Sequence, residues 1–252
     1  MSATTPGTVP AAHRNGHHDP RDLTGWREHT RVFLQPIAAP SILGLFGFAA
    51  ATFMVSAHLA RWYGSTVTPQ YLFPFAATFG GLAQFAAGMW AYRARDGLAT
   101  AMHGMWGSFW LAFGILNLLA AVRVLTLPTG TFVELGYWFV TLAVITASGA
   151  VAAMAESLGL TSVLGTLAVG SGLLAVGYLT GVNGWIEAGG WVLIASAILA
   201  WYTASAMMLE STFGRVLLPL GKPGAKDANM PGGIVHQPIE FELGEPGVRH
   251  GQ

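Results

Sequence analysis

The sequence predicts an all-α integral membrane protein with six transmembrane helices, and composition is the first observation behind this prediction. Hydrophobic residues make up 53% of the 252 residues, charged residues only 10%, and the mean hydropathy is +0.51. Six runs without a charged residue are each long enough to cross a hydrocarbon core of about 30 Å, which takes roughly 20 helical residues. Backbone in lipid is either helical or part of a closed barrel, and the runs lack the alternation of barrel strands.

The chain divides into a membrane domain and polar segments around it. We expect residues 1–23, rich in Pro, Gly, Ala and His, to form a disordered cytoplasmic tail, because they cannot bury enough apolar surface to order themselves. They contain no apolar core of a secretory signal peptide. Residues 24–35 mix aromatic and charged side chains, which predicts an amphipathic segment at the membrane interface. Residues 36–221 hold the six spans, and residues 222–252, rich in Gly, Pro and charge, predict a flexible cytoplasmic tail.

Positive charge sorts to one side of the predicted spans. The charge-free runs cover residues 32–60, 62–92, 97–122, 135–155, 157–186 and 188–209. If the spans alternate in direction, ten of the twelve Lys and Arg residues lie on the side of the termini, and only Arg61 and Arg123 lie on the other. Cytoplasmic segments carry the excess of Lys and Arg. The sequence therefore predicts a multi-pass protein of the cell (inner or plasma) membrane with both termini in the cytoplasm.

Composition and missing motifs argue against several classes of function. A formal net charge near zero gives no reason to expect a nucleic-acid partner. The chain has no cysteine for a disulfide or a thiolate metal site, and it has no Gly-rich phosphate loop or dinucleotide motif. The acids Glu134, Glu156, Glu187 and Glu210 stand at predicted span ends, so we expect neither a catalytic carboxylate pair nor a buried proton carrier among them. We predict no enzyme activity, no metal and no cofactor.

The first span contains "PSILGLFGFAAATFMVSAH" (residues 40–58), which is apolar but carries a polar stripe. At 100° per residue, one arc of about 80° holds Ser41, Phe48, Thr52 and Ser56. Such hydroxyls either bond to their own backbone or line a path. Gly44 and Gly47 allow close packing beside that face. His58 lies off the stripe and is either a proton acceptor or an interfacial residue.

The second span contains "GGLAQFAAGMWAY" (residues 80–92), in which small residues recur at spacings of three and four. Gly81 and Gly88 let helix backbones approach closely, so this face predicts a packing seam. Gln84 lies on the same face, where it either bonds across the seam or contacts substrate. Glycines are therefore expected to set the distance to the next helix.

The third span, residues 97–119, has the most distinct pattern. An arc of about 80° holds His103, Trp106, Trp110, Gly114 and Asn117. The tryptophans are either interfacial anchors or pore-lining residues, and we favour the pore because they lie deep beside polar groups. His103 either relays protons or is a neutral residue bonded to a neighbouring helix.

The last two spans carry similar mixed faces. The fifth-span face holds Leu167, Ser171, Leu174 and Tyr178. The sixth-span face holds Ser196, Thr203, Met207 and Glu210. Together the faces are mildly polar, rich in aromatic residues and nearly uncharged. That combination predicts a narrow passage for a small, partly apolar solute.

Four segments in consistent order resemble one family over residues 37–222. They read "APSILGLFGF" (39–48), "GGLAQFAAGMWAY" (80–92), "GSFWL" (107–111) and "FGRVLLPLG" (213–221). They are similar to segments of the acetate uptake transporter family, of the succinate-acetate permease type. The resemblance implies six helices per subunit, a ring-shaped homohexamer with a path in each subunit, and transport of acetate and similar short carboxylates, succinate included.

The resemblance also implies a constriction made of two aromatic residues and a leucine. By register these are Phe48, Trp106 and Leu167, with Trp106 standing where the family has Tyr. Ala39 stands where the family has Asn, so Ser41 or free N–H groups at the helix start are the expected donors to a carboxylate. The predicted substrate contacts are Ser41, Thr52, Gln84, Trp110, Asn117 and Tyr178.

Three functions fit these patterns. The first is proton-linked or acid-form passage of short carboxylates through the constriction, with His58 and His103 as candidate proton relays. The second is a channel for a neutral or ammonium-like small solute. The third is a membrane subunit that transports nothing and scaffolds a partner.

Overall fold

The computed structural model describes residues 37–128 and 130–224. The amphipathic segment predicted at residues 24–35 and the tail predicted at residues 1–23 lie outside the described residues. All but the first three residues of the C-terminal tail, predicted at 222–252, lie outside them too.

The six spans predicted from hydropathy are present as helices that are long and apolar enough to cross a membrane. Their ranges are Pro40–Leu59, Thr68–Ala94, Gly97–Ala121, Val133–Ala153, Leu158–Thr180 and Asn183–Phe213. The corresponding elements are α2 (Pro40–Leu59), α3 (Thr68–Phe75), η1 (Ala76–Ala83), α4 (Gln84–Ala94), α5 (Gly97–Ala121), α6 (Val133–Ala153), α7 (Leu158–Thr180) and α8 (Asn183–Phe213). The all-α fold with six candidate transmembrane helices is confirmed.

The second span is a single rod made of α3, η1 and α4. Pro74 lies inside α3 and cannot donate a backbone hydrogen bond to the preceding turn. The rod continues directly into the wider π-helical turn of η1, which contains Gly80 and Gly81. Such turns occur where the regular helix ladder is interrupted. The sequence pattern did not predict this interruption.

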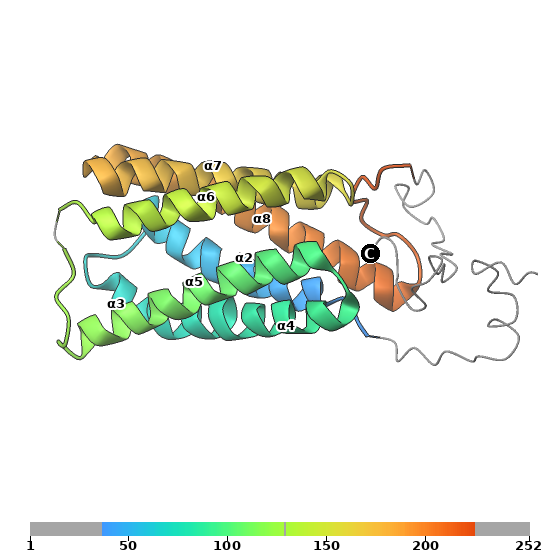
Figure 1. Cartoon of the computed structure of the whole chain (residues 1–252), viewed down its shortest axis with the longest axis horizontal. Coiled ribbons are helices and arrows are strands. Elements are labelled where there is room, and N and C mark those ends of the chain that lie inside the picture. The colour runs from blue at the N-terminus through green and yellow to red at the C-terminus, as the bar shows by residue number, and fades with distance from the viewer. Residues whose placement is uncertain (1–36, 129, 225–252) are drawn as a thin grey trace, which may run out of the picture.

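The spans pack around a closed circuit. Along the circuit α6 contacts α7, α7 contacts α8, α8 contacts α2, α2 contacts η1 and α4, these contact α5, and α5 returns to α6. Figure 1 shows α6 and α7 along one side and α4 and α5 along the other, with α2 and α8 between them. The circuit turns the polar faces of different spans toward a common interior.

The two ends of the bundle have different connections (Figure 1). The termini-side end carries the start of α2, the α4–α5 and α6–α7 connections and the segment after α8. There Asp96 caps α5 by accepting from the Ala99 N–H at 2.8 Å, and Ser157 caps α7. The segment after α8 folds back, and its Gly221 carbonyl accepts from the Leu158 N–H at 3.1 Å. The opposite end carries the other three connections.

Glycines set the closest helix contacts. A Cβ on Gly88 would lie 2.7 Å from the Gly104 nitrogen, so α4 and α5 touch backbone to backbone. A Cβ would likewise meet His103 at Gly44, the Phe79 carbonyl at Gly47 and Leu111 at Gly81. Each predicted packing glycine therefore faces another span at close range.

Candidate functional site

The bundle interior contains two small cavities that share a wall. Trp106 and Leu167 line both cavities, and Phe48 lines the one toward the termini-side end. The rings of Phe48 and Trp106 meet edge to face with centroids 6.2 Å apart. All three side chains are buried, at 1–3% exposure. The three residues that the resemblance implied thus come together from α2, α5 and α7. Their side chains form the wall between the two cavities.

Trp106 is held by a residue that sequence reasoning missed. Its Nε1 donates to the Thr146 Oγ1 of α6 at 3.0 Å, and Thr146 is fully buried. Its ring also packs edge to face on Phe109, with centroids 5.4 Å apart. On the fourth span Tyr137, Thr141 and Ser148 share one helix face, and Thr146 lies on the opposite face, so the polar pattern of the sequence does not indicate Thr146. The indole orientation therefore depends on how α6 packs against α5.

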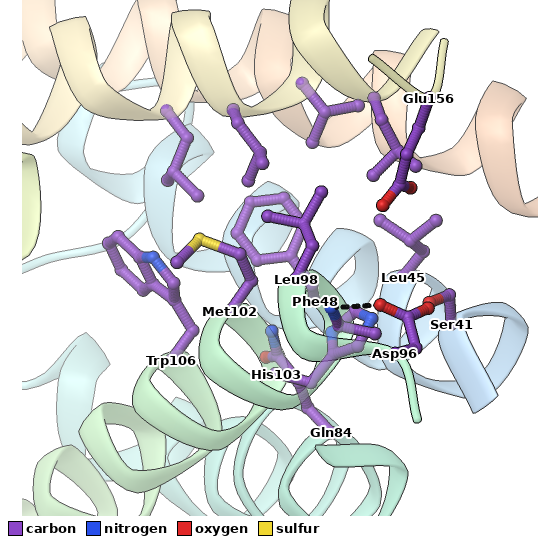
Figure 2. A pocket seen from close by; sticks show the side chains of 15 residues that line it. Ser41, Leu45, Phe48, Gln84, Asp96, Leu98, Met102, His103, Trp106 and Glu156 are labelled. Carbon is purple, nitrogen blue, oxygen red and sulfur yellow. Dashed lines mark hydrogen bonds between the residues drawn. The ribbon is translucent and has the colours of Figure 1, made fainter. Parts of the chain in front are cut away.

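The termini-side cavity has a volume of about 30 Å³, enough for roughly two water molecules. Its polar lining residues are Ser41, Gln84, Asp96, His103 and Glu156. The rest of the wall is apolar and consists of aliphatic side chains, Met102 and the aromatic rings of Phe48 and Trp106. Figure 2 shows Glu156 entering from the α6–α7 connection while Ser41 and Asp96 lie across from it. Of the predicted site residues, the cavity collects Ser41, Gln84 and His103 beside the constriction.

Two carboxylates, Asp96 and Glu156, line this cavity. The sequence pattern indicated Glu156 only as an acid at a span end, without a role in proton transfer, and it did not indicate Asp96. Burial raises the pKa of Glu156 to about 7, and the nearby charge of Asp96 adds to the effect. Burial also raises the pKa of Asp96, while the N–H groups of Ala99 and Leu98 act to lower it. Glu156 and Asp96 belong to different connections, so no helix wheel could pair them.

The opposite-side cavity has a volume of about 40 Å³. Its polar or amphipathic lining includes Thr52, Ser56, Trp110 and Tyr178. The Thr52 Oγ1 and the Trp110 Nε1 are buried without a hydrogen-bond partner among the described residues. A buried donor without a partner costs free energy, so both atoms are suited to a polar guest. Tyr178 stacks on Phe139 with ring centroids 5.7 Å apart.

The remaining predicted site residues lie away from these cavities. Asn117 is buried, but it donates to the Phe113 carbonyl of its own helix at 2.9 Å and lines neither cavity. His58 Nδ1 lies 3.2 Å from the Tyr63 carbonyl oxygen, in the connection after α2. On the sixth-span face, Ser196 donates across to the Val163 carbonyl at 2.9 Å. Each of these side chains lies within hydrogen-bond distance of a backbone carbonyl oxygen.

Comparison with known proteins identifies the family. The model of the GPR1/FUN34/yaaH family matches residues 27–220. The succinate-acetate/proton symporter SatP of Escherichia coli is 28% identical over 188 residues, which are 74% of this chain and 96% of that protein. The acetate transporter protein patA of Aspergillus clavatus is 30% identical over 195 residues, covering 73% of this chain and 78% of that protein.

A yeast relative and a solved bacterial structure also match this chain. The ammonia transport outward protein 2 of Saccharomyces cerevisiae is 32% identical over 174 residues, or 67% of this chain, and the match spans 61% of the yeast protein. The solved structure of the bacterial acetate channel SatP superposes with a TM-score of 0.68 at 27% identity, covering 74% of this chain and all of that one. The matched family, the shared fold and the four motifs agree, so this multi-pass membrane protein belongs to the GPR1/FUN34/yaaH family of transport proteins and not to an enzyme family.

Proposed function

We propose that the protein carries acetate and similar short carboxylates across a membrane, as the neutral acid or together with a proton. The observation that carries the proposal is the buried wall of Phe48, Trp106 and Leu167 between two cavities with unsatisfied polar atoms. A guest that fits such a path is small, has an apolar end and offers both a hydrogen-bond donor and an acceptor. A short carboxylic acid meets these conditions.

The cavities favour the neutral acid over the anion. Neither Lys nor Arg occurs among the described residues that line the two cavities. Stripping water from a bare carboxylate costs several kcal/mol when no cation replaces it. Protonating an acid whose pKa is about 4.3 at about pH 7 costs about 3.7 kcal/mol, at 1.36 kcal/mol per pH unit. Passage as the neutral acid therefore costs no more free energy than passage as a desolvated anion.

The polar contacts along the proposed path differ at the two sides of the wall. Ser41 and Gln84 meet the acid on the termini side, and Thr52, Trp110 and Tyr178 meet it on the other. We place the termini in the cytoplasm, from the distribution of Lys and Arg, and the chain in a ring of six copies, each with its own path.

The test is uptake of labelled acetate into proteoliposomes that contain the purified protein. Uptake above empty liposomes, faster at about pH 6 than at about pH 8 outside, is expected because the acid form carries the flux. Formate, propionate, lactate and succinate serve as competitors. Trp106→Ala should widen the range toward the larger competitors, whereas Trp201→Ala, at an exposed position, should not. If Trp106→Ala leaves uptake and competition unchanged, the wall is not the constriction.

A second candidate function is passage of ammonium or ammonia. It is favoured by the name of the yeast relative and by the two carboxylates, Asp96 and Glu156, which attract cations. Labelled methylammonium, tested in the same liposomes, separates the two. Passage of the neutral amine would accelerate as the external pH rises, whereas passage of the ammonium ion would hardly change between about pH 6 and about pH 8. Neither path would respond to acetate as a competitor.

A further inference from the structure

The proposed contacts of the carboxylic acid leave the acidic pair at the termini-side cavity without a role. Asp96 precedes α5 and Glu156 precedes α7, and both line the cavity that ends at Phe48, Trp106 and Leu167. In Figure 2 the Glu156 carboxylate points across the cavity toward the side that holds Asp96 and Ser41. Any solute that crosses the constriction on this side passes the pair.

The two acids are not equivalent. Asp96 is fixed as the cap of α5, where its Oδ1 accepts from the Ala99 N–H at 2.8 Å, and the start of a helix favours negative charge. Glu156 lies one residue before Ser157, which caps α7, so its own carboxylate is not held as a cap. It is half-buried and lies close to the charge of Asp96. Two neighbouring carboxylates of this kind retain one proton more readily than either alone. The retained proton belongs mainly to Glu156.

An independent feature of the cavity indicates which ligand it suits. Gln84 is 2% exposed and lines the same cavity, and its Oε1 has no hydrogen-bond partner among the described residues. A buried amide oxygen can only accept a hydrogen bond. The O–H of a carboxylic acid supplies the donor that this oxygen lacks, whereas an ionised carboxylate does not.

The other charged or titratable groups come from α5, the end of α4, α8 and the segment after α8. On α5, His103 lines the cavity, and Arg93 and Arg95 lie just before Asp96 at the end of α4. The lining residues from α2 and α7 carry no titratable side chain. The segment after α8 contributes Lys222, whose Nζ lies 2.8 Å from the Glu210 Oε1.

We propose that Asp96 and Glu156 form a proton-exchange site at the termini-side mouth, where a short carboxylic acid gives its proton to Glu156 and leaves as a carboxylate. The substrate O–H bond breaks and its electron pair stays on the substrate. A new O–H bond forms on Glu156, so the total charge is conserved, and Glu156 then releases the proton to water. The reverse order serves flux in the other direction. The inference rests on the proposed carboxylate function.

The test measures initial influx of labelled acetate into proteoliposomes oriented with the termini side facing the lumen. External pH is held constant and lumen pH is varied. Initial rates are measured before labelled acetate accumulates in the lumen. Lumen pH then affects influx only through the groups of the protein that face the lumen. The wild-type rate should rise about tenfold from about pH 6 to about pH 8 in the lumen, as the accepting form of Glu156 grows with a midpoint near 7.

Three variants decide the outcome. Glu156→Gln should give slow influx that no longer depends on lumen pH. Asp96→Asn keeps a helix-capping side chain and removes the neighbouring charge, so the midpoint should move to lower pH. Glu134→Gln removes an exposed acid at the opposite end and should behave as wild type.

The results separate this inference from the proposed function. If Glu156→Gln keeps the wild-type dependence on lumen pH, or if Asp96→Asn leaves the midpoint unmoved, the exchange site is wrong while acetate transport stands. If the wild-type protein moves no acetate, both fail. If Glu156→Gln does not fold, the midpoint of the dependence of influx on lumen pH in Asp96→Asn tests the exchange site by itself.

Discussion

Trp106 is held by a hydrogen bond that it donates to a neighbouring span and by edge-to-face contacts of its ring. The Nε1 donates to the Thr146 Oγ1, and the ring contacts Phe48 at the shared wall of the two cavities. Sequence reasoning found Trp106 because it shares a helix face with other polar and aromatic residues. It missed Thr146, because a contact between spans depends on which helices are neighbours.

Removing that hydrogen bond should loosen the wall. Thr146→Val keeps the volume but leaves the indole N–H without its partner, which costs about 1–3 kcal/mol for a buried group. We expect a lower apparent Tm in detergent and weaker discrimination between acetate and succinate in liposomes. Thr146→Ser keeps a hydroxyl and should retain both properties. Equal behaviour of the Val and Ser variants would show that the hydrogen bond does not position Trp106.

Glu156 should make the stability of the protein depend on pH. Its pKa is about 7 in the folded state against 4.5 for an unperturbed glutamate, so the folded state binds this proton more tightly. Folded-state stability therefore falls as pH rises through the interval between these two values. The apparent Tm should be higher at about pH 5.5 than at about pH 8, and Glu156→Gln should shrink that difference. An unchanged difference in Glu156→Gln would contradict the assigned pKa.

At the scale of the elements, backbone contact between α4 and α5 holds the second and third spans together. The "GGLAQFAAGMWAY" pattern predicted a seam of small residues, and Gly88 does lie against the backbone of Gly104. The same pattern left the place of Gln84 open. Its side chain lines the termini-side cavity, and its Oε1 has no hydrogen-bond partner among the described residues.

The α4–α5 contact offers a matched pair of substitutions. Gly88→Ala would put a Cβ 2.7 Å from a backbone nitrogen, so the helices must separate, at a cost of about 1–3 kcal/mol. Gly104→Ala meets nothing within 4 Å and should be neutral or slightly stabilising, because Ala favours helix. Thermal unfolding in detergent measures both. If Gly104→Ala were as unstable as Gly88→Ala, the loss of stability would not come from the close contact between α4 and α5.

At the scale of the whole molecule, the distribution of charge predicts the orientation in the bilayer. The chain has no cysteine, so a single introduced cysteine is a unique label. Ser65 is exposed in the connection after α2, and Met154 is 62% exposed in the connection after α6, at the other end. In intact cells a membrane-impermeant maleimide should label Ser65→Cys, and it should label Met154→Cys only after permeabilisation. The reverse pattern would place the termini outside.

The sequence by itself determined the spans, their number and the family. These follow from local properties, because hydropathy over about 20 residues decides insertion and motifs are read along one chain. It also determined which residues share a helix face, as for Phe48 with Thr52 and Trp106 with Trp110. The tertiary structure alone decided what each face meets. Asp96 came to lie by Glu156, and Trp106 by Thr146, because helix packing in the circuit, which no single-span periodicity encodes, brought separate segments to one place.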